Sequence, residues 1–519
     1  MKLKIMIMAL LLMSVGIGSA VNRLPATEFT GDVGMGGYNI SDAKINYSNR
    51  IVYFGPYDWC NYVADGTDDH VTLQNAINAV SSITTLRTTG GGTVFVVPYN
   101  YDIGGQVNVY NRVKITSINS GSLQAKESYW NDSLAQAARM CITFNTSEAF
   151  KVRSGAVLEG LQFYYPGQVT NGTPLEYPAT VYLIQYNSDH SVIRDCQFVN
   201  SYYAINATES GGAHIIQNCR GFALKYGYKA DTGQGTTRIE HFSFSNAYWP
   251  DAESVLIQWV QENGVCFYLE SEDWIRLSDV SCFGYKYGLY ADGNADMYLT
   301  DAGFDACYLP VYLTNCKHPK ISGGYFVAKP FYGDSVGYAG IQFAGTSVSA
   351  VVVGNVINSD MHGILGLPSN SVCVGNNIID WGDGTTADLR AIHTAGNHVT
   401  ISANVMSMSA PTALTTGVYS SGCWNVISNN VIADHGTYGI QLAPTTNDNI
   451  ISSNSIVKST GAYWKSSGAR NIINGIGYNV GNPASTGDWK TYGREGISVV
   501  DTGNNTIYQY ANGGWRALN

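Results

Sequence analysis

The phrase Gly354-Asn355-Val356-Ile357 is the first of five related phrases in the second half of the chain. Each sets a small residue and an asparagine before β-branched apolar residues, and the others are Gly375-Asn376-Asn377-Ile378-Ile379, Ser402-Ala403-Asn404-Val405, Ser428-Asn429-Asn430-Val431-Ile432 and Ser453-Asn454-Ser455-Ile456-Val457. Alignment of the last asparagine before each apolar step gives spacings of 22, 27, 26 and 24 residues, for Asn355, Asn377, Asn404, Asn430 and Asn454. Such a period marks a repeat architecture, and asparagine suits its turns because it tolerates the left-handed conformation and can bond to copies above and below. The sequence therefore predicts a coil of stacked strands.

The same period can be followed in the middle of the chain. Four cysteine phrases occupy similar places there: Asp195-Cys196-Gln197-Phe198, Asn218-Cys219-Arg220-Gly221, Ser281-Cys282-Phe283-Gly284 and Ala306-Cys307-Tyr308-Leu309. Tyr-rich alternation follows them, as in residues 285–290, and alternation at period two predicts strands with one face inside the coil. Residues 125–138 and 248–261 interrupt this pattern, and insertions in solenoids usually fall on one face.

An entry segment lies between Asp65 and Pro98. It contains the phrase Asp65-Gly66-Thr67-Asp68-Asp69, then apolar residues at 73, 76, 77 and 80 that predict a helix, then the strand Gly91-Gly92-Thr93-Val94-Phe95-Val96-Val97-Pro98. These three features resemble the entry of the pectate-lyase-like right-handed parallel β-helix superfamily. The resemblance implies an all-β fold, a right-handed parallel β-helix (solenoid) with an N-terminal capping helix and a small C-terminal β module.

Four segments are expected along the chain. Residues 1–20 look like a signal peptide, with Lys2 and Lys4 before an apolar stretch and small residues at the cleavage site. Residues 21–60 are expected to form an extended N-terminal arm, 61–478 the β-helix, and 479–519 a small C-terminal β cap module of three strands. The mature chain is thus expected to be extracellular, with no membrane span after signal cleavage.

The composition is poor in charge. Charged residues make up 13% of the chain, whereas roughly 25% is usual, and the net charge is −10. Gly (57) and Tyr (36) are abundant, so few charged side chains guard the sheet edges against pairing with other molecules. The sequence shows no basic patch, which argues against nucleic acid as a partner.

Ten cysteines, none in a CxxC pair, are present. The absence of CxxC pairs argues against a zinc site or a thioredoxin-like motif of the usual spacing, and favours disulfides in a secreted chain. Cys196 and Cys219 are 23 residues apart and Cys282 and Cys307 are 25 apart, which is about one coil in each case. Neighbouring strands lie roughly 4.8 Å apart, so each pair can bridge adjacent coils. The alternative is a set of buried free thiols packed as small apolar groups.

The resemblance also implies that the chain could cleave polysaccharides, so its sequence can be compared with the catalytic phrases of enzymes in this superfamily. A hydrolase of this superfamily needs carboxylates gathered on one face, often with a Gly-His-Gly turn and an Arg-x-Lys phrase, and none of these phrases is complete. We therefore predict no catalytic, cofactor-binding or metal-binding residues, and we interpret Asp68-Asp69 as helix-capping. The remaining acidic cluster surrounds Arg276 and comprises Glu262, Glu270, Glu272, Asp273 and Asp279, with Asp292, Asp296, Asp301 and Asp305 in the neighbouring coil. Ca²⁺ binding there is weighed against solvated acids that pair locally with Arg276 and Lys286.

Asn-x-Ser/Thr tripeptides are candidate glycosylation sites in a secreted chain, and they occur at Asn39, Asn46, Asn131, Asn145, Asn171, Asn206 and Asn504.

Two functional hypotheses follow. The first is an extracellular structural protein that assembles with copies of itself, through solenoid edges or ends, into a cell-surface layer or sheath with amyloid-like stacking. In overall style the chain is similar to surface and sheath proteins of methanogenic archaea. The alternative is a secreted polysaccharide lyase or hydrolase, or a tailspike-like adhesin that binds carbohydrate, with cell-surface polysaccharide as the partner.

Overall fold

The computed structural model describes residues 51–519 except 82–83, 86–87, 90, 118–137, 185–189, 209–210, 232, 234, 332–336, 380–388, 409–414, 434, 458–461, 466–469, 474–475, 480–497, 502–505, 512–513 and 519. The predicted signal peptide and most of the predicted arm lie outside these residues, and the predicted domain boundaries remain predictions. Within the described part of the chain, no helix is both long and apolar enough to cross a membrane.

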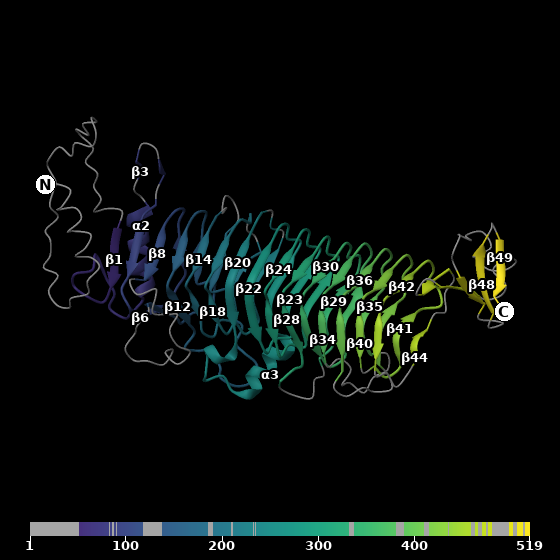
Figure 1. The fold of residues 1–519 in the computed structure, drawn as a ribbon. Coiled ribbons are helices and arrows are strands. Elements are labelled where there is room, and N and C mark those ends of the chain that lie inside the picture. Colours follow the sequence, from purple (N-terminus) through teal and green to yellow (C-terminus); the bar gives the residue numbers. More distant parts are fainter. Residues whose placement is uncertain are drawn as a thin grey trace, which may run out of the picture. The chain divides into compact units, whose positions relative to one another are not determined.

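Residues 51–473 form a right-handed parallel β-helix, as predicted, with three strands in most coils (Figure 1). One coil consists of β24 (Tyr298–Thr300), β25 (Gly303–Asp305) and β26 (Leu309–Thr314). The chain then returns as β27 (Lys320–Ser322), which pairs in parallel with β24. Three faces result, which we call face 1, face 2 and face 3 after the order of the strands in this coil.

Face 1 contains β24, β27 and β1 (Ile51–Gly55), β5 (Thr93–Val96), β8 (Lys114–Ser117), β11 (Val157–Glu159), β14 (Val192–Arg194), β17 (Ile215–Gln217), β20 (Arg238–Phe244), β22 (Arg276–Phe283), β30 (Val351–Val353), β33 (Val372–Val374), β36 (Thr400–Ser402), β39 (Val426–Ser428), β42 (Ile450–Ser452) and β45 (Ile472–Ile473). Face 2 contains β25 and β6 (Tyr99–Ile103), β9 (Ala138–Ile142), β12 (Leu161–Tyr164), β15 (Gln197–Phe198), β18 (Arg220–Gly221), β28 (Tyr325–Ala328), β31 (Val356–Ser359), β34 (Asn377–Ile379), β37 (Val405–Ser407), β40 (Val431–Ala433) and β43 (Ser455–Val457). Because β20 and β22 run across the corner, faces 1 and 2 belong to one sheet.

Face 3 is a separate 14-stranded sheet. It contains β26 and β7 (Val107–Val109), β10 (Phe150–Val152), β13 (Val181–Leu183), β16 (Tyr203–Ala207), β19 (Tyr226–Asp231), β21 (Val265–Glu270), β23 (Tyr287–Asp292), β29 (Ala339–Ala344), β32 (His362–Leu367), β35 (Leu389–Thr394), β38 (Thr415–Ser420), β41 (Tyr438–Leu442) and β44 (Ala462–Lys465).

The core consists of side chains stacked coil upon coil. One inward row of face 1 runs in unbroken register from Val52 to Ile473, through Val94, Ile115, Leu158, Ile193, Ile216, Ile239, Leu277, Leu299, Ile321, Val352, Cys373, Ile401, Ile427 and Ile451. All of these side chains are buried. Period-two alternation therefore places one β-branched or apolar residue of every coil in the same column.

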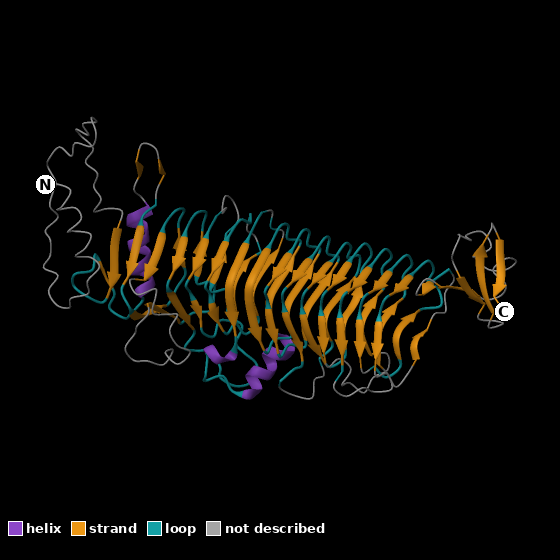
Figure 2. Ribbon diagram, in the orientation of Figure 1, coloured by secondary structure: helices purple, strands orange, loops and turns teal. Residues whose placement is uncertain are grey.

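The entry helix is α2 (Asp69–Ser81), which buries the four predicted apolar residues Leu73, Ala76, Ile77 and Val80 (Figure 2). Asp69 is fully buried and accepts backbone N–H groups of Asp65, Gly66 and Asp102 at 2.9–3.1 Å. Its carboxylate thus ties the entry loop to β6. These donors lie outside the helix, so Asp69 does not cap α2 as the sequence predicted. The short strands β2 (Tyr62–Val63), β3 (Thr84–Thr85) and β4 (Thr88–Thr89) flank this region.

The asparagine repeat forms a buried hydrogen-bond ladder at the corner between faces 1 and 2. Each ladder residue follows a residue with positive φ, and these are Gly354, Gly375, Ala403, Asn429 and Ser453. The side-chain oxygen of each asparagine from Asn376 onward accepts both the backbone N–H and the side-chain amide of the asparagine in the preceding coil, at 2.9–3.0 Å. The left-handed corner explains why small residues and asparagine precede the ladder position.

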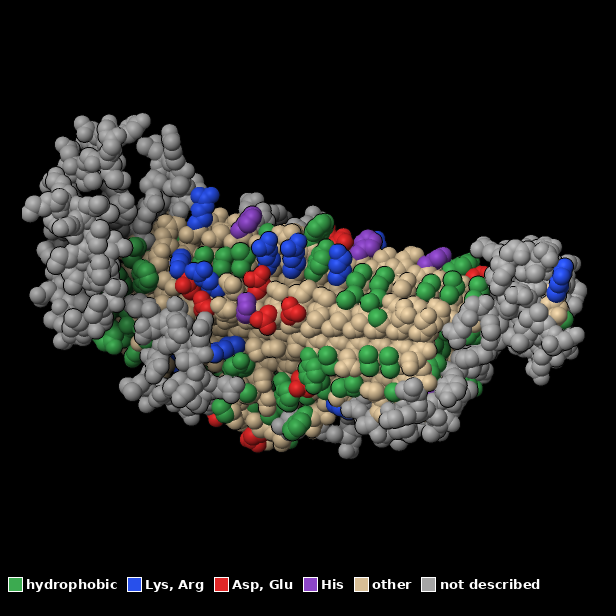
Figure 3. Space-filling view, viewed as in Figure 1, with side chains coloured by type: hydrophobic (Ala, Val, Ile, Leu, Met, Phe, Trp, Pro, Cys, Tyr) green, Lys and Arg blue, Asp and Glu red, His purple; other side chains and the backbone are tan. Residues whose placement is uncertain are grey.

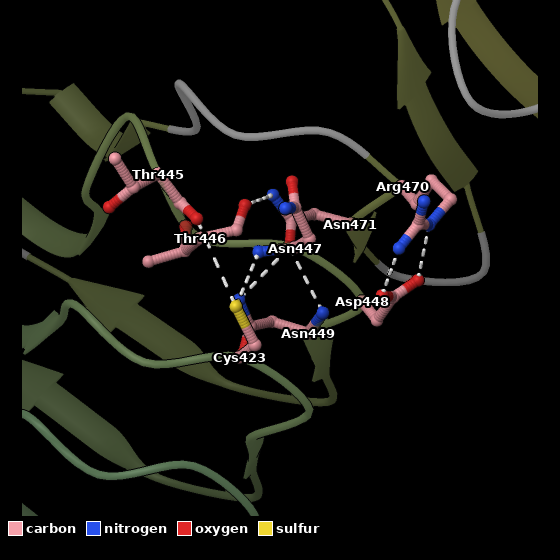
Figure 4. A network of polar contacts seen from close by, with 8 residues as sticks. All are labelled: Cys423, Thr445, Thr446, Asn447, Asp448, Asn449, Arg470 and Asn471. Carbon is pink, nitrogen blue, oxygen red and sulfur yellow. Dashed lines mark hydrogen bonds and ion pairs between the residues drawn. The ribbon is translucent and has the colours of Figure 1, made fainter.

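Sequence alignment placed Asn377 in this ladder, and that register is wrong by one residue. Asn376 is buried and bonded to Asn355 and Asn404, whereas Asn377 begins β34 with its side chain exposed. The observed spacings from Asn355 are therefore 21, 28, 26 and 24 residues. A second, shorter ladder of Asn425, Asn449 and Asn471 lies at the corner between faces 3 and 1. Figure 4 shows its end, where Arg470 pairs with Asp448 beside Asn471.

The predicted C-terminal strands are also present. β47 (Ser498–Asp501), β48 (Thr506–Ala511) and β49 (Gly514–Leu518) pair antiparallel in sequence order, and β46 (Ile476–Asn479) precedes them.

Candidate functional site

A row of tyrosines on face 3 is the most prominent arrangement of functional side chains among the described residues. Tyr268 of β21, Tyr290 of β23 and Tyr312 of β26 occupy the same outward position in three successive coils. The rings of Tyr268 and Tyr290 stack with centroids 5.1 Å apart, and those of Tyr290 and Tyr312 with centroids 5.3 Å apart. Together with Tyr226 and Tyr287, which pack edge-on against this row, they form what we call the tyrosine platform.

The stacking determines which chemistry the platform offers. Because each ring lies against the ring of the next coil, much of each ring face is covered by its neighbour, which leaves ring edges and hydroxyl groups as the parts that a ligand can contact. Burial raises the pKa of Tyr268, Tyr287 and Tyr290, so the phenols stay neutral and can both donate and accept hydrogen bonds. Ring edges carry partial positive charge and attract oxygen lone pairs. The platform therefore suits a ligand rich in hydroxyl or carboxylate oxygens.

Three lysines lie beside the platform. Lys225 and Lys286 precede β19 and β23, whereas Lys229 lies within β19 in register with Tyr268. Lys229 Nζ lies 5.3 Å from the ring centroid of Tyr226 and 5.5 Å from that of Tyr268. Lys225 Nζ lies 5.6 Å from the centroid of Tyr226, and Lys286 Nζ lies 5.5 Å from that of Tyr287. Burial, and then repulsion from Lys286, lowers the pKa of Lys225. These cations supply charged donors beside the phenols.

Carboxylates border the platform where the strands end. Asp231, Glu270 and Asp292 are the last residues of β19, β21 and β23 and pair in register, so we call them the acidic row. Tyr268 Oη donates to Glu270 Oε2 at 3.1 Å, and Asn315 Nδ2 donates to Asp292 Oδ1 at 2.8 Å. Burial, and then repulsion from Glu270, raises the pKa of Asp231. The platform thus has cationic donors on one side and anionic acceptors on the other.

Glu272 lies next to the acidic row but points into the solenoid, with 2% of its surface exposed. It accepts the backbone N–H of Gly233 at 2.8 Å, and its own N–H donates to Asn294 Oδ1. Burial raises the pKa of Glu272 to about 7, and the nearby charge of Asp231 adds to the rise. Its position makes it a support of the strand ends rather than a group that meets a ligand.

The predicted interruption at 248–261 adjoins the platform. It contains η4 (Asn246–Tyr248) and α3 (Ser254–Asn263), which lie beside the solenoid in Figure 2. The ring of Trp259 lies 6.3 Å from that of Tyr202, and Lys225 Nζ donates to the carbonyl oxygen of Asn263 at 2.9 Å. The insertion therefore positions one of the platform's lysines.

The structure separates the acidic cluster predicted around Arg276. Glu270 and Asp292 belong to face 3, whereas Arg276 lies on face 1 with its guanidinium 5.5 Å from the ring of Tyr298. Asp279 and Asp296, at two different corners, lie 3.2 Å from His241 and 3.4 Å from His318. Among the described residues, no group of three or more His, Cys, Asp or Glu side chains is arranged to hold a metal ion.

A polar cleft of about 300 Å³ is present where faces 1 and 2 meet. It is lined by Asp195, Cys196, Asn218, Cys219, Arg220, His241, Ser243 and Tyr248. The Arg220 guanidinium lies 5.8 Å from the ring of Tyr248, whose hydroxyl donates to Ser243 Oγ at 3.4 Å. Two of the cysteine phrases supply five of these residues, but their sequence did not predict a cleft, because its remaining lining comes from a third coil.

All ten cysteines carry free thiols in the structure, and the proposed pairings remain predictions. Cys282 and Cys307 bring their sulfurs to 3.7 Å. Cys196 and Cys219 follow the positive-φ residues Asp195 and Asn218 in adjacent coils, as their spacing predicts. The four cysteine phrases do not share one place, however, since Cys282 lies in an inward row of face 2 between Phe244 and Phe304.

Three of the candidate glycosylation sites are described. Asn145 and Asn171 are exposed, and Asn206 is half-buried in β16. Asn171 Nδ2 donates to Glu253 Oε2 at 2.9 Å. Asn39, Asn46, Asn131 and Asn504 lie outside the described residues, and glycan attachment remains a prediction at all seven sites.

Sequence reasoning found the alternating tyrosines but missed the platform. The alternation shows that these side chains share a side of their own strand, whereas the stack depends on the register between coils. Lys225 and Lys229 carried no signal, and Lys286 was interpreted only as a local partner of the acidic cluster.

Comparison with known proteins gave structural likenesses alone. No family model and no curated protein matches the chain. Among solved structures, the Dettilon tailspike protein is 14% identical with a TM-score of 0.47, covering 80% of this chain and 69% of that one. Tailspike protein 3 of bacteriophage CBA120 is 13% identical with a TM-score of 0.43, covering 88% and 67%. PfbA, a surface adhesin of Streptococcus pneumoniae, is 13% identical with a TM-score of 0.35, covering 90% and 98%. At this level of similarity the comparisons assign no function, and the chain is a right-handed parallel β-helix protein.

Proposed function

We propose that the chain is an extracellular β-helix that binds a polysaccharide along the tyrosine platform. The observation that carries this proposal is the row of Tyr268, Tyr290 and Tyr312, which repeats one phenol per coil along the solenoid axis. A polysaccharide presents hydroxyl groups repeatedly along its length. A linear row of neutral donors and acceptors can therefore bind several sugar units of one chain together, which multiplies weak contacts.

The borders of the platform add selectivity to this binding. Lys225 and Lys286, which precede β19 and β23, favour carboxylate, sulfate or phosphate substituents on one side of the bound chain. The acidic row accepts hydrogen bonds from sugar hydroxyls on the other side. A polysaccharide with an anionic group on one edge of its chain would match both borders.

Affinity electrophoresis tests the proposal. The purified protein is run in gels that contain alginate, polygalacturonate or neutral dextran, and we expect slower migration in at least one anionic gel. Tyr268→Ser with Tyr290→Ser should abolish the retardation, whereas the control Tyr325→Ser, on face 2 with 47% of its surface exposed, should retain it. Equal migration in every gel, or retardation that survives the platform variant, would contradict polysaccharide binding at this site.

The acidic row also favours cleavage of the bound polysaccharide as a second candidate. Residues in register on adjacent strands lie about 4.8 Å apart, and carboxyl groups of retaining glycosidases are about 5–5.5 Å apart. Release of new reducing ends or of unsaturated ends by the wild type, lost in Glu270→Gln while binding persists, would support this candidate. Binding without release would leave the protein as an adhesin.

Assembly into a cell-surface layer or sheath remains a proposal as well. It requires at least two different contacts between copies, because one two-fold contact closes into a pair. Electron microscopy of the native cell surface and of concentrated purified protein tests it, and the absence of any ordered array from both would contradict it.

A further inference from the structure

The polar cleft where faces 1 and 2 meet is built from side chains of three successive coils. Asp195, Asn218 and His241 are the corner residues of these coils, and each has a positive φ. Two residues further along each strand, Arg220 and Ser243 pair in register on face 2. These five side chains line a volume of about 300 Å³. The cleft therefore lies along this corner, away from the tyrosine platform on face 3.

One wall of the cleft comes from the insertion that follows face 2. Tyr248 ends η4, its ring centroid lies 5.8 Å from the guanidinium carbon of Arg220, and its hydroxyl donates to Ser243 Oγ at 3.4 Å. The next residue, Trp249, has only 1% of its surface exposed, which holds η4 against the solenoid. The corner of a solenoid is convex by itself, so this wall is what makes the surface concave here. Because the wall is fixed by buried contacts, the cleft is preformed, as small-molecule sites usually are.

The lining offers hydrogen-bond donors and acceptors side by side. Asn218 Nδ2 donates to Asp195 Oδ1 at 3.1 Å, which leaves Asp195 Oδ2 to accept from a ligand. Ser243 Oγ accepts two hydrogen bonds, one of them from Ser281 Oγ at 2.9 Å, so its own proton is left to donate. The guanidinium group of Arg220 carries five N–H donors in one plane. The cleft thus suits a ligand whose groups both donate and accept, which is the property of hydroxyl groups.

The charges of the cleft balance. Arg220 and Asp195 carry one charge of each sign, and His241 Nε2 lies 3.2 Å from Asp279 Oδ2, just outside the lining. Figure 3 shows acidic, basic and histidine side chains mixed over the coils of this part of the solenoid. An ion of either sign would therefore meet a group of its own charge, whereas a neutral ligand would not.

From this lining we infer that the cleft binds a single neutral sugar unit through its hydroxyl groups. Each hydroxyl of a sugar ring donates and accepts, so different hydroxyls of one ring can bond to Asp195, Arg220 and Ser243. The volume of about 300 Å³ is at the lower end of the range for small-molecule sites, so the cleft holds one ring rather than a stretch of polysaccharide. The inference is independent of the proposed function, because the platform lies on another face.

Saturation-transfer difference NMR of the purified full chain tests this inference. The probes are the methyl glycosides of glucose, galactose and mannose, with glucuronate and glucosamine as charged relatives. At least one neutral glycoside should bind, and it should bind more tightly than glucuronate or glucosamine. The platform variant Tyr268→Ser with Tyr290→Ser should bind this glycoside like the wild type, which separates the cleft from the platform.

Two substitutions in the cleft should each weaken this binding at least tenfold. Asp195→Asn replaces the acceptor oxygen Oδ2 with a donor and keeps a residue type that tolerates the positive φ, whereas Arg220→Gln removes the guanidinium group. The matched controls are Asp301→Asn, at a positive-φ corner outside the cleft, and Arg238→Gln, exposed on face 1. Both controls should bind the glycoside like the wild type.

Circular dichroism checks that each variant is folded, and Asp195→Asn keeps the test decisive if Arg220→Gln fails to fold. Binding of no neutral glycoside would overturn the inference. So would tighter binding of glucuronate or glucosamine, cleft variants that bind like the wild type, controls that lose binding as well, or a loss of binding in the platform variant.

Discussion

Asn404 donates both its backbone N–H and its side-chain amide to Oδ1 of Asn430, each at 3.0 Å. The same amide group also donates to the carbonyl oxygen of Cys373 at 3.0 Å. The side chain thus joins three successive coils in a buried setting. Every amide in the ladder depends on its neighbours, since a missing member leaves buried donors of the preceding coil without an acceptor.

Asn376→Ala should therefore be costly, whereas Asn377→Ala should not. Removal of the Asn376 side chain leaves the backbone N–H and the amide of Asn355 without their acceptor. We expect a loss of about 3 kcal/mol in the free energy of unfolding for Asn376→Ala and of less than about 0.5 kcal/mol for the exposed Asn377. Urea unfolding followed by circular dichroism measures both losses. Equal losses would contradict the assignment of Asn376, rather than Asn377, to the ladder.

Glu272 should make the protein less stable as pH rises toward neutrality. Its pKa is raised from 4.5 to about 7 in the folded state, so the folded form holds a proton that the unfolded form releases between these values. This stabilisation is complete below about pH 4.5 and is lost as pH rises through about 7, by about 3 kcal/mol at most.

Glu272→Gln keeps an oxygen for the Gly233 N–H and removes the titration. The pKa of about 7 lies between pH 5 and pH 8. From the lower to the higher pH, the unfolding free energy of the wild type should therefore fall relative to that of the variant, which keeps the Gly233 contact. A constant difference would mean that the carboxyl group titrates elsewhere.

Cys282 and Cys307 should form a disulfide when the protein is produced in an oxidising compartment. Their sulfurs lie 3.7 Å apart, and burial raises the pKa of both thiols, so the bond should form during folding rather than in the folded protein. Peptide mapping without reduction should find Cys282 linked to Cys307. Linkage of Cys282 to Cys266, or free thiols throughout, would contradict the pairing.

Gly221→Ala should destabilise the solenoid strongly because β18 passes very close to the coil before it. A Cβ atom at Gly221 would lie 1.9 Å from the carbonyl oxygen of Phe198. We expect a loss of more than about 4 kcal/mol, or failure to fold.

Gly303→Ala is the matched control on face 2. There the nearest atom to the added Cβ would be Ser281 Cβ at 3.8 Å, so we expect no loss and a gain of up to about 1 kcal/mol. Similar effects of the two substitutions would show that backbone proximity at Gly221 is relieved by a shift of the coil.

Much of the fold could be predicted from local signals. Leu73, Ala76, Ile77 and Val80 identified the entry helix, since helical periodicity needs no tertiary information. The candidate site could not be predicted in this way. Arg276 and Glu270 are close in sequence but lie on different faces, because the corner after residue 271 turns the chain away from face 3.

The sequence by itself determined that the chain coils, roughly how long each coil is, and which side of each strand points inward. These properties follow from alternation and turn residues within a single coil. Only the tertiary structure decided that Asn376 rather than Asn377 joins the ladder, and that Tyr268, Tyr290 and Tyr312 share one row. The physical reason is that coils differ in length, from 21 to 28 residues along this ladder, so the register between them is set by packing and hydrogen bonds across coils.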